Sequence, residues 1–382
     1  MENKRKILLQ TSKNFYNIIL NHPEVYNALD TEMAKEILSI LSSCTLNFPF
    51  PKNFTPSPLD TKPKEKTQKI PKIIYFSPNG ENFCTGGNLI SIYENLKNKN
   101  LNKLNETYKI YITICYLLSF MEPIQIVEWK GYVMGTGIGI SINSPIRIAT
   151  ETTVFSMPEC QIGCFPDQGA SFFFHYIFHN KPYFGLYAGL TGLRIKGKDN
   201  IKFGIATHFV SKHLLEDCKK EIINFCDNND DFTVEDISNI ILKFGEGNFD
   251  NKDYKFDNED VIKEVFVCDS IYKIYERLEN KIKNGNEKEK KFCKKTLDTL
   301  NNECPESLIV FTELFKRAKN LKNITECYIQ DEISMNKFFE KGEFHEGIRA
   351  ILIDKDKKFN FTHKTIYDIK NPEEIINQFI PK

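Results

Sequence analysis

Residues 131–169, GYVMGTGIGISINSPIRIATETTVFSMPECQIGCFPDQG, decide the fold of this chain. The stretch opens with a glycine-rich turn, residues 135–139, where backbone N–H groups can approach a ligand closely and a following helix N-terminus favours negative charge. It closes with two carboxylates that each follow a proline, Glu159 and Asp167. A carboxylate in an apolar segment is a candidate for a raised pKa and for work as an acid, base or nucleophile. Backbone donors and carboxylates together suit acyl chemistry, in which an oxyanion is stabilised while a nucleophile is activated.

The length, composition and charge of the chain limit its possible fold and partners. Its 382 residues, 41% of them hydrophobic, predict one large domain with an appendage and a sizeable core. Basic and acidic residues number 51 each, so no global field points to nucleic acid or to an anionic membrane. No apolar run reaches the roughly 18–20 residues of a membrane span. The 11 cysteines are scattered without zinc-type spacing, which predicts free, mostly buried thiols in a reducing compartment and no metal site.

Hydrophobic periodicity divides the chain near residue 210. Before it, strand and helix patterns alternate, with strands expected at residues 7–11, 15–21, 73–77, 124–129, 146–155, 194–196 and 208–210. After it, helical spacing dominates, with helices expected at residues 261–279, 287–300, 306–319 and 326–341. We therefore predict an α/β core over residues 1–210 and a helical region over residues 211–382. Residues 45–72, rich in proline, lysine and threonine, predict a flexible surface insertion inside the core, either a tolerated loop or a partner-binding one.

A second glycine loop, FCTGGNL at residues 83–89, precedes another expected helix. The order is strand, glycine loop, helix, strand, glycine loop, helix and strand. This order predicts a β/α spiral in which the two glycine loops could face one site.

Several motifs together resemble the crotonase (enoyl-CoA hydratase/isomerase) superfamily: HPEVYNALD at residues 22–30, the two glycine loops, and the tail of the central stretch. Within it, the segments MPECQIGCFPDQGASFFF, IKGKDNIKFGIATHFV and FHEGIRAILIDKDKKFNF look like the 3-hydroxyisobutyryl-CoA hydrolase branch. The resemblance covers nearly the whole chain except the insertion and parts of residues 225–260.

The resemblance implies a spiral of ββα units with a helical C-terminal region. It also implies an oxyanion hole made by the backbone N–H groups of Thr85 and Thr136. Carried over residue by residue, the contacts with the substrate and its CoA group fall on Val25, Tyr26, Ala28, Gly86, Gly87, Gly135 and Tyr111. No cofactor is implied, because CoA is part of the acyl-CoA substrate. The implied location is mitochondrial, with the cytoplasm as the alternative.

The carboxylates separate hydrolysis from hydration. Hydratases of this superfamily use two glutamates; Glu159 matches one, and Gly139 stands where the other would lie. What remains is Glu159 with Asp167, the pair that the hydrolases use, so the resemblance implies hydrolysis of 3-hydroxyisobutyryl-CoA, as in valine breakdown. Glu159 either attacks the thioester to give a mixed anhydride or acts as general base toward water. Asp167 either positions the 3-hydroxyl or handles protons for the leaving thiolate.

Two alternatives stand beside the hydrolase. One is an enoyl-CoA hydratase-like enzyme with another acyl specificity. The other is a catalytically idle relative that serves as a structural subunit of a mitochondrial ribosome, the one hypothesis that brings a nucleic-acid partner. Both carboxylates and both glycine loops are intact, and the chain lacks a basic excess, which favours the enzyme. The helical C-terminal region could support self-association into a homo-oligomer.

Three positions depart from the family pattern. Thr136 stands where a middle glycine is usual, and a β-branched residue would be strained there if its φ were positive. Glu24 replaces a lysine common near the CoA phosphates. Around Tyr111 no substrate-contacting carboxylate is found on the expected long helix.

Overall fold

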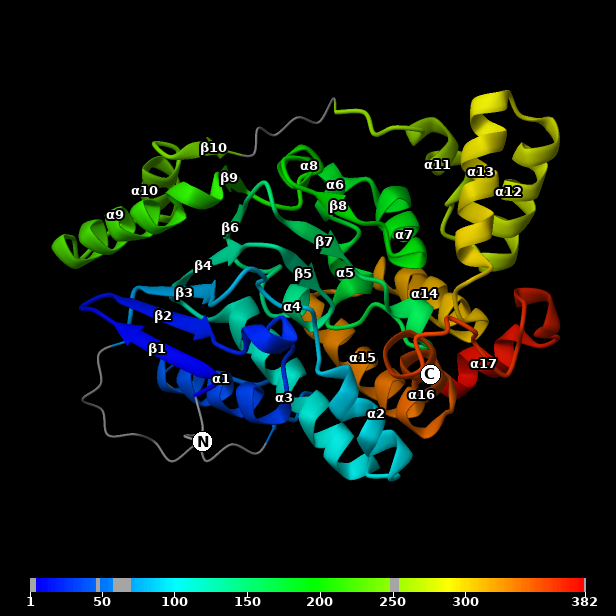
Figure 1. Ribbon diagram of the computed structural model, residues 1–382, viewed down its shortest axis with the longest axis horizontal. Coiled ribbons are helices and arrows are strands. Elements are labelled where there is room, and N and C mark those ends of the chain that lie inside the picture. Colours follow the sequence, from blue (N-terminus) through cyan, green and yellow to red (C-terminus); the bar gives the residue numbers. More distant parts are fainter. Residues whose placement is uncertain (1–4, 46–48, 58–69, 248–253, 381–382) are drawn as a thin grey trace. The chain divides into compact units, whose positions relative to one another are not determined.

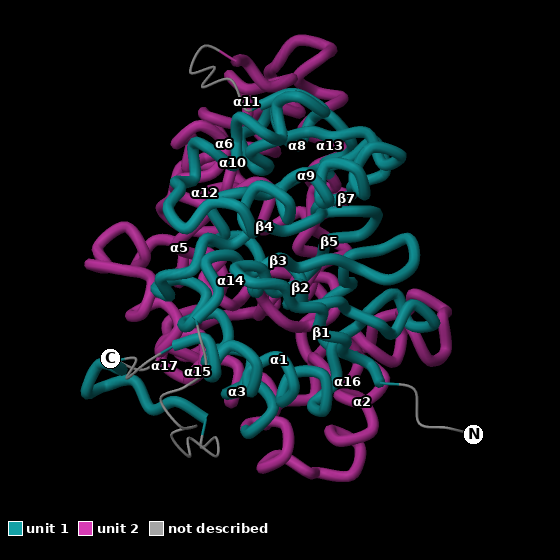
Figure 2. The backbone as a smooth tube through the Cα atoms, turned by 90° about the vertical axis from the view of Figure 1, so that its left-hand side faces the viewer, with its two compact units in different colours: residues 1–88, 106–155, 195–251 teal, residues 89–105, 156–194, 252–382 magenta. Residues whose placement is uncertain are grey.

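The computed structural model describes residues 5–45, 49–57, 70–247 and 254–380 (Figure 1). The chain forms two compact units, shown in two colours in Figure 2. The first unit comprises residues 1–88, 106–155 and 195–251, and the second comprises residues 89–105, 156–194 and 252–382. The domain boundary predicted near residue 210 does not coincide with this division, because each unit takes segments from both sides of it.

A seven-stranded sheet organises the first unit. Its order is β1-β2-β3-β4-β6-β9-β10, with the inner strands parallel and with β1 and β10 antiparallel at the two edges. The strands are β1 (Ile7–Thr11), β2 (Phe15–Leu20), β3 (Ile73–Pro78), β4 (Ile124–Trp129), β6 (Ile146–Ala149), β9 (His208–Val210) and β10 (Gly245–Gly247). All six residues of β3 are buried, as expected of a parallel strand covered on both faces.

A smaller sheet of three strands, in the order β5-β7-β8, belongs to the same unit. Its strands are β5 (Tyr132–Met134), β7 (Val154–Ser156) and β8 (Ile195–Lys196). The run expected as one strand over residues 146–155 is split into β6 and β7. The break is a threonine turn in which the Thr150 backbone N–H donates to Thr153 Oγ1 at 2.7 Å, so the side chain satisfies a group that a ladder would otherwise pair.

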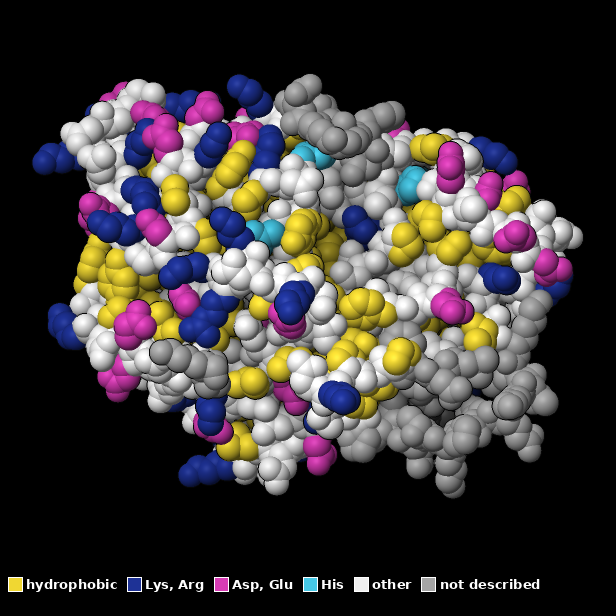
Figure 3. All heavy atoms as spheres, turned by 180° about the vertical axis from the view of Figure 1, so that it is seen from behind, with side chains coloured by type: hydrophobic (Ala, Val, Ile, Leu, Met, Phe, Trp, Pro, Cys, Tyr) yellow, Lys and Arg dark blue, Asp and Glu magenta, His cyan; other side chains and the backbone are white. Residues whose placement is uncertain are grey.

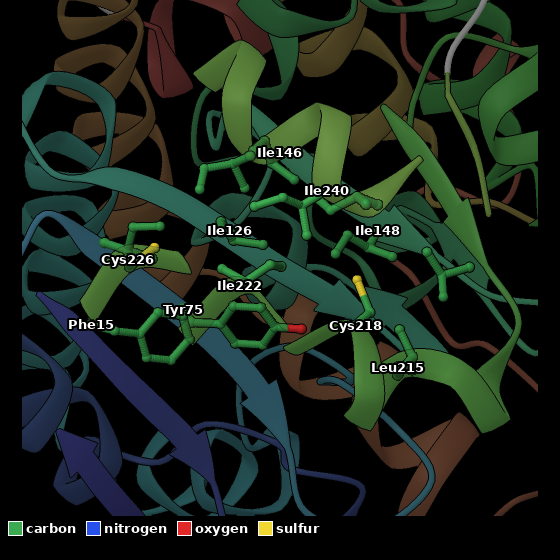
Figure 4. Close-up of a cluster of buried hydrophobic side chains, with 14 residues drawn as sticks. Phe15, Tyr75, Ile126, Ile146, Ile148, Leu215, Cys218, Ile222, Cys226 and Ile240 are labelled. Atoms are coloured by element: carbon green, nitrogen blue, oxygen red, sulfur yellow. The ribbon is translucent and has the colours of Figure 1, made fainter. Parts of the chain in front are cut away.

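One face of the large sheet is covered by helices that the sequence assigns to the C-terminal region. In α9 (Leu215–Asn228) and α10 (Val234–Ile241), apolar residues at helical spacing pack on strand residues of the sheet. Figure 4 shows Phe15 and Tyr75 from the strands facing Cys218 and Ile222 from α9. These helices therefore complete the core of the first unit, which explains why the unit extends beyond residue 210. Its remaining elements are α1 (Thr31–Ser43), most of α3 (Leu101–Phe120), α4 (Thr136–Gly139), α8 (Asp199–Lys202) and the 3-10 turns at Pro23–Val25 and Lys212–Leu214.

Part of the insertion predicted as flexible is packed. In residues 49–57, Phe54 is buried and its ring stacks on Tyr116 of α3, with 4.5 Å between centroids. The Tyr116 hydroxyl donates to the Pro49 carbonyl at 3.1 Å. The prediction of a flexible segment is wrong for these residues, because their aromatic side chains find an apolar surface on α3. The rest of the insertion, residues 46–48 and 58–69, lies outside the described residues.

The second unit is helical. It contains α2 (Leu89–Lys97), the 3-10 helix η2 (Glu159–Ile162), α5 (Ala170–Phe173), α6 (Ile177–Asn180), α7 (Pro182–Thr191), α11 (Glu259–Val265), α12 (Ile271–Asn284), α13 (Glu287–Leu300), α14 (Pro305–Ala318), α15 (Ile324–Glu340), α16 (Glu343–Ile348), the π-helical turn Arg349–Ile353, the 3-10 turn Ile366–Asp368 and α17 (Pro372–Phe379). The helix expected over residues 261–279 is broken, because Ser270 caps α12 by accepting a hydrogen bond from the Lys273 backbone N–H.

Two chain-wide expectations can be compared with the structure. Ten of the eleven cysteines are buried and all eleven are free, which confirms the predicted free, mostly buried thiols. None of the helices in the described part of the chain is both long enough and apolar enough to cross a bilayer.

Candidate active site

The two glycine loops run side by side in the first unit. The Cys84 backbone N–H donates to the Tyr132 carbonyl, and the Met134 N–H donates to the Cys84 carbonyl, both at 3.0 Å. This short parallel bridge aligns the segment that carries Thr85 with the segment that carries Thr136.

Small residues permit this close approach. A Cβ atom added to Gly137 would lie 2.7 Å from Cys84 Cβ and 2.8 Å from the Cys84 carbonyl oxygen. Gly86 has φ of +101°, and a Cβ added there would lie 3.5 Å from the Thr136 backbone nitrogen. The structure thus brings the predicted oxyanion-hole segments together; glycine is required by the spacing at position 137 and by the positive φ at position 86.

The strain expected at Thr136 does not arise. The positive φ of this loop, +48°, belongs to Gly135, and Thr136 is the first residue of α4 with ordinary helical geometry. A β-branched residue is tolerated there because its Cβ does not meet the left-handed clash. This departure from the family pattern therefore does not disturb the backbone.

The predicted acyl-CoA contacts from the N-terminal motif lie next to the first glycine loop. The Leu29 N–H donates to the Gly86 carbonyl and the Asn88 N–H donates to the Leu29 carbonyl, each at 2.8 Å. These bonds place Val25, Tyr26 and Ala28 on a segment joined to the Gly86–Gly87 turn. Tyr26 is 55% exposed, so its side chain is accessible, and its contact with substrate stays a prediction.

Tyr111, predicted to contact the substrate, contacts the backbone of the 25–29 segment. Its side chain is buried, and its hydroxyl donates to the Leu29 carbonyl at 2.6 Å. The geometry makes Tyr111 a support for the 25–29 segment, and its direct contact with substrate stays a prediction. Glu24, the residue that replaces a family lysine, is exposed on the same segment.

The two carboxylates lie together in the second unit. Glu159 begins η2, which ends at Gly163 with φ of +70°, and the Cys164 N–H donates back to the Glu159 carbonyl at 3.2 Å. This turn brings Glu159 close enough to Asp167 for the two charges to interact. Glu159 is 9% exposed and Asp167 5% exposed. The eight-residue spacing therefore works through a turn, as predicted.

The electrostatics of this pair suit acid–base or nucleophilic work. Burial raises the pKa of Glu159 well above its ordinary value, and the negative charge of Asp167 raises it further. Glu159 Oε2 has no hydrogen-bond partner among the described residues. A buried carboxylate oxygen without a partner is costly and points to a ligand or a reacting group.

Helix α16 supports the Glu159 turn by direct backbone contact. A Cβ added to Gly163 would lie 2.2 Å from the Glu343 carbonyl oxygen, and one added to Gly347 would lie 2.1 Å from the Ile162 carbonyl oxygen. In the sequence, the segment around Gly347 is recognisable only through the family resemblance. Its structural purpose is visible only when α16 is seen against the turn.

Helix α15 supports the segment that carries Asp167. Its residues Ile324, Cys327, Tyr328, Asp331, Met335 and Phe338 recur at helical spacing and face residues 164–171. Cys164 Sγ lies 3.6 Å from Met335 Sδ, and the Phe165 and Phe338 rings are 5.3 Å apart. The sequence analysis missed Asp331, a carboxylate on this otherwise apolar face. The signal that could have found it is an acidic residue in phase with the apolar stripe.

No group of three or more histidine, cysteine, aspartate or glutamate side chains in the described ranges has the arrangement of a metal site. The first unit offers backbone donors in its glycine loops, and the second unit offers buried carboxyls. Such groups serve acyl transfer and proton transfer.

Comparison with known proteins places the chain. Residues 60–380 match the family described as enoyl-CoA hydratase/isomerase. The chain is 32% identical to "3-hydroxyisobutyryl-CoA hydrolase, mitochondrial" of Dictyostelium discoideum, over 92% of this chain and 86% of that protein. It is 31% identical to "Small ribosomal subunit protein mS47" of Schizosaccharomyces pombe, over 96% of this chain and 79% of that protein.

Solved structures agree on the fold. An enoyl-CoA hydratase from Rhodobacter sphaeroides superposes with a TM-score of 0.77 at 22% identity, covering 99% of this chain and 98% of that chain. A carnitinyl-CoA dehydratase from Mycobacterium thermoresistibile superposes with a TM-score of 0.76 at 19% identity, covering 99% and 97%. The family match over most of the chain, the 32% identical relative and the shared fold lead to one conclusion: the chain belongs to the enoyl-CoA hydratase/isomerase, or crotonase, family.

Proposed function

We propose that this protein is an acyl-CoA thioester hydrolase and that its substrate is 3-hydroxyisobutyryl-CoA. The observation that carries the proposal is the buried pair of Glu159 and Asp167 in one turn. Relatives from Dictyostelium discoideum and Danio rerio, which are named 3-hydroxyisobutyryl-CoA hydrolases, support the choice of substrate.

The glycine loop supports hydrolysis over hydration. Hydration of a C=C bond needs a second carboxylate to place and activate water, and position 139 carries none. Gly139 is buried inside α4, so no side chain projects from it. An enzyme of this family with Glu159 and Asp167 but without that second glutamate is suited to attack on a carbonyl.

In the proposed reaction, the backbone N–H groups of Thr85 and Thr136 bind the thioester oxygen as negative charge develops on it. One such donor is worth about 3 kcal/mol in the transition state. Ionised Glu159 either attacks the carbonyl carbon, giving a mixed anhydride and CoA thiolate, or removes a proton from the attacking water. In the first route water then hydrolyses the anhydride and frees Glu159, and in both routes the thiolate takes up a proton, so the products are 3-hydroxyisobutyrate and CoA.

Asp167 is assigned the substrate's 3-hydroxyl. It is a buried carboxyl beside Glu159, and its oxygens can accept a hydrogen bond. An ionised carboxylate accepts hydrogen bonds and donates none. It therefore suits a hydroxyl donor on the substrate and would distinguish 3-hydroxyisobutyryl-CoA from isobutyryl-CoA.

The test is CoA release from short acyl-CoA thioesters by wild type and by Glu159→Gln. Chromatography should detect CoA, because 11 cysteines could react with a thiol dye. We expect the variant to lose activity by about a hundredfold or more, as for an essential acid–base group. Glu122→Gln, at an exposed position, is the matched control and should retain activity. Folded wild type that hydrolyses no thioester, or a fully active Glu159→Gln, would overturn the proposal.

A second candidate is a structural subunit of a mitochondrial ribosome, favoured by the 31% identity to mS47. The charge of this chain argues against a ribosomal role, because basic and acidic residues are equal in number, at 51 each. On the face seen in Figure 3, lysine and arginine side chains are interspersed with aspartate and glutamate rather than gathered in one patch. RNA-facing proteins concentrate basic charge. Sedimentation of the native protein as a free, low-mass species would support the enzyme, and co-sedimentation with a ribosomal subunit would support this alternative.

The proposed location is the mitochondrion, supported by the names of several relatives. Fractionation with a protease-protection assay tests it, and recovery in the cytosol would overturn it. Self-association stays a prediction, which a measurement of molecular mass in solution checks.

A further inference from the structure

We propose that Asp331 is a positioning residue that clamps the backbone turn immediately after Asp167. Its consequence for catalysis rests on the proposed hydrolase function. The clamp itself is a structural claim and can be tested without any activity.

The turn after Asp167 has an unusual backbone. Gln168 and Gly169 both have positive φ, +54° and +90°, and the Ala170 N–H donates to the Asp167 carbonyl at 3.0 Å to close the turn. A non-glycine residue in this conformation costs on the order of 1–3 kcal/mol and persists only where its surroundings enforce it. Something outside the turn must therefore hold it.

Asp331 provides that hold. Its Oδ2 accepts a hydrogen bond from the Gly169 backbone N–H at 2.7 Å, and its side chain is fully buried. Ile324 and Tyr328, on the same face of α15, would each lie 3.0 Å from a Cβ added to Gly169. The helix thus holds Gly169 by one polar bond and leaves little room for a side chain there, which constrains the turn that follows Asp167.

An aspartate on this apolar stripe is explained by its bond to the Gly169 backbone N–H. Asp331 Oδ1 has no hydrogen-bond partner in the described structure, and an unsatisfied buried oxygen costs about 1–3 kcal/mol. An apolar residue in the stripe would avoid that cost but would leave the Gly169 N–H without an acceptor. The aspartate therefore supplies the acceptor that the turn needs.

The charge state of Asp331 is compatible with this role. Burial raises its pKa well above the ordinary value, the bond from Gly169 acts in the opposite direction, and the charge of Asp167 raises it again. Cys327, whose Sγ lies 3.7 Å from Oδ2, is itself held neutral because burial raises its pKa. Asparagine keeps a side-chain oxygen that can accept from the Gly169 N–H and carries no charge, so Asp331→Asn should preserve the bond.

The experiment compares Asp331→Asn and Asp331→Ala with the control Ser334→Ala, a buried residue of the same helix. The first readout is amide hydrogen exchange of residues 164–174. The second is the ratio of kcat/KM for 3-hydroxyisobutyryl-CoA to that for isobutyryl-CoA. For Asp331→Ala we expect exchange about tenfold faster, since the turn loses its anchor, and a ratio about tenfold lower, since Asp167 no longer meets the hydroxyl.

Asp331→Asn should match wild type in both readouts, and so should Ser334→Ala. A merely structural role would lower activity on both substrates equally and leave their ratio unchanged, and that result would overturn the proposal. Unaltered exchange in Asp331→Ala would overturn it as well. If the alanine variant does not fold, Asp331→Ser, whose hydroxyl is too short to replace the carboxyl, is judged by the same criteria. Should wild type hydrolyse no thioester, the proposed function fails, while the exchange measurement still decides the clamp.

Discussion

Substitution of Gly347 by alanine tests whether helix α16 sets the position of Glu159. A new Cβ would lie 2.1 Å from the Ile162 carbonyl oxygen, and contacts under 3.0 Å are essentially never seen. Helix and turn must therefore separate by roughly 0.9 Å, the difference between these two distances. Displacement of a catalytic group by about 1 Å can cost on the order of a hundredfold in rate. We expect kcat of Gly347→Ala to fall by about that factor.

Helix propensity acts in the opposite direction, which makes this substitution informative. Alanine is favoured over glycine inside a helix by about 1 kcal/mol, whereas overpacking costs typically about 1–3 kcal/mol. The free energy of unfolding should therefore fall by no more than about 2 kcal/mol, and the variant should remain folded while losing activity.

The assay is CoA release measured together with urea unfolding. Gly342→Ala is the matched control, because a Cβ there meets nothing within 4 Å. It should keep wild-type kcat. If Gly347→Ala is as active as Gly342→Ala, the reasoning that α16 fixes the Glu159 turn is refuted.

Four further predictions concern the carboxylate pair, the glycine loops and the insertion. Because the ionised form of Glu159 acts in the proposed reaction, kcat/KM should fall as pH drops through its raised pKa. Asp167→Asn removes a negative charge, so the acid limb of the pH profile of this variant should move to lower pH. An unmoved limb would count against an electrostatic interaction between Glu159 and Asp167. The same raised pKa destabilises the folded state as pH rises through it, so Glu159→Gln should unfold at a higher temperature than wild type at pH 8, with the gain shrinking toward pH 5. Gly137→Ala forces a Cβ to 2.7 Å from Cys84 Cβ and should lower kcat, with substrate binding measured separately to show that the loss lies in the transition state. Phe54→Ala should lower the free energy of unfolding by about 3 kcal/mol while kcat is unchanged. An unchanged unfolding midpoint would show that the packing of residues 49–57 contributes nothing to stability.

Much of the fold could be predicted because its signals are local. Strand and helix periods placed β1 to β4, and the glycine loops with their flanking elements gave the order of the spiral. The errors arose where a local pattern has two outcomes. The helical spacing of Leu215 and Ile222 does not indicate whether α9 completes the sheet core or joins the later helices. Likewise, the composition of the insertion hides that Phe54 meets Tyr116.

The candidate site divides in the same way. The sequence by itself singled out the candidate reactive groups, since Glu159 and Asp167 stand in short motifs and backbone donors require only glycine-rich turns. Tertiary structure alone decided what holds them: Asp331 against Gly169, and the backbone of α16 against the Glu159 turn. The chemical identity of the candidate groups depends on single residues and their neighbours in the sequence. Support comes from residues more than 150 positions away in the chain, such as Asp331 with Gly169, at a separation of 162. Only folding brings such residues together, because no local propensity encodes a contact over that distance.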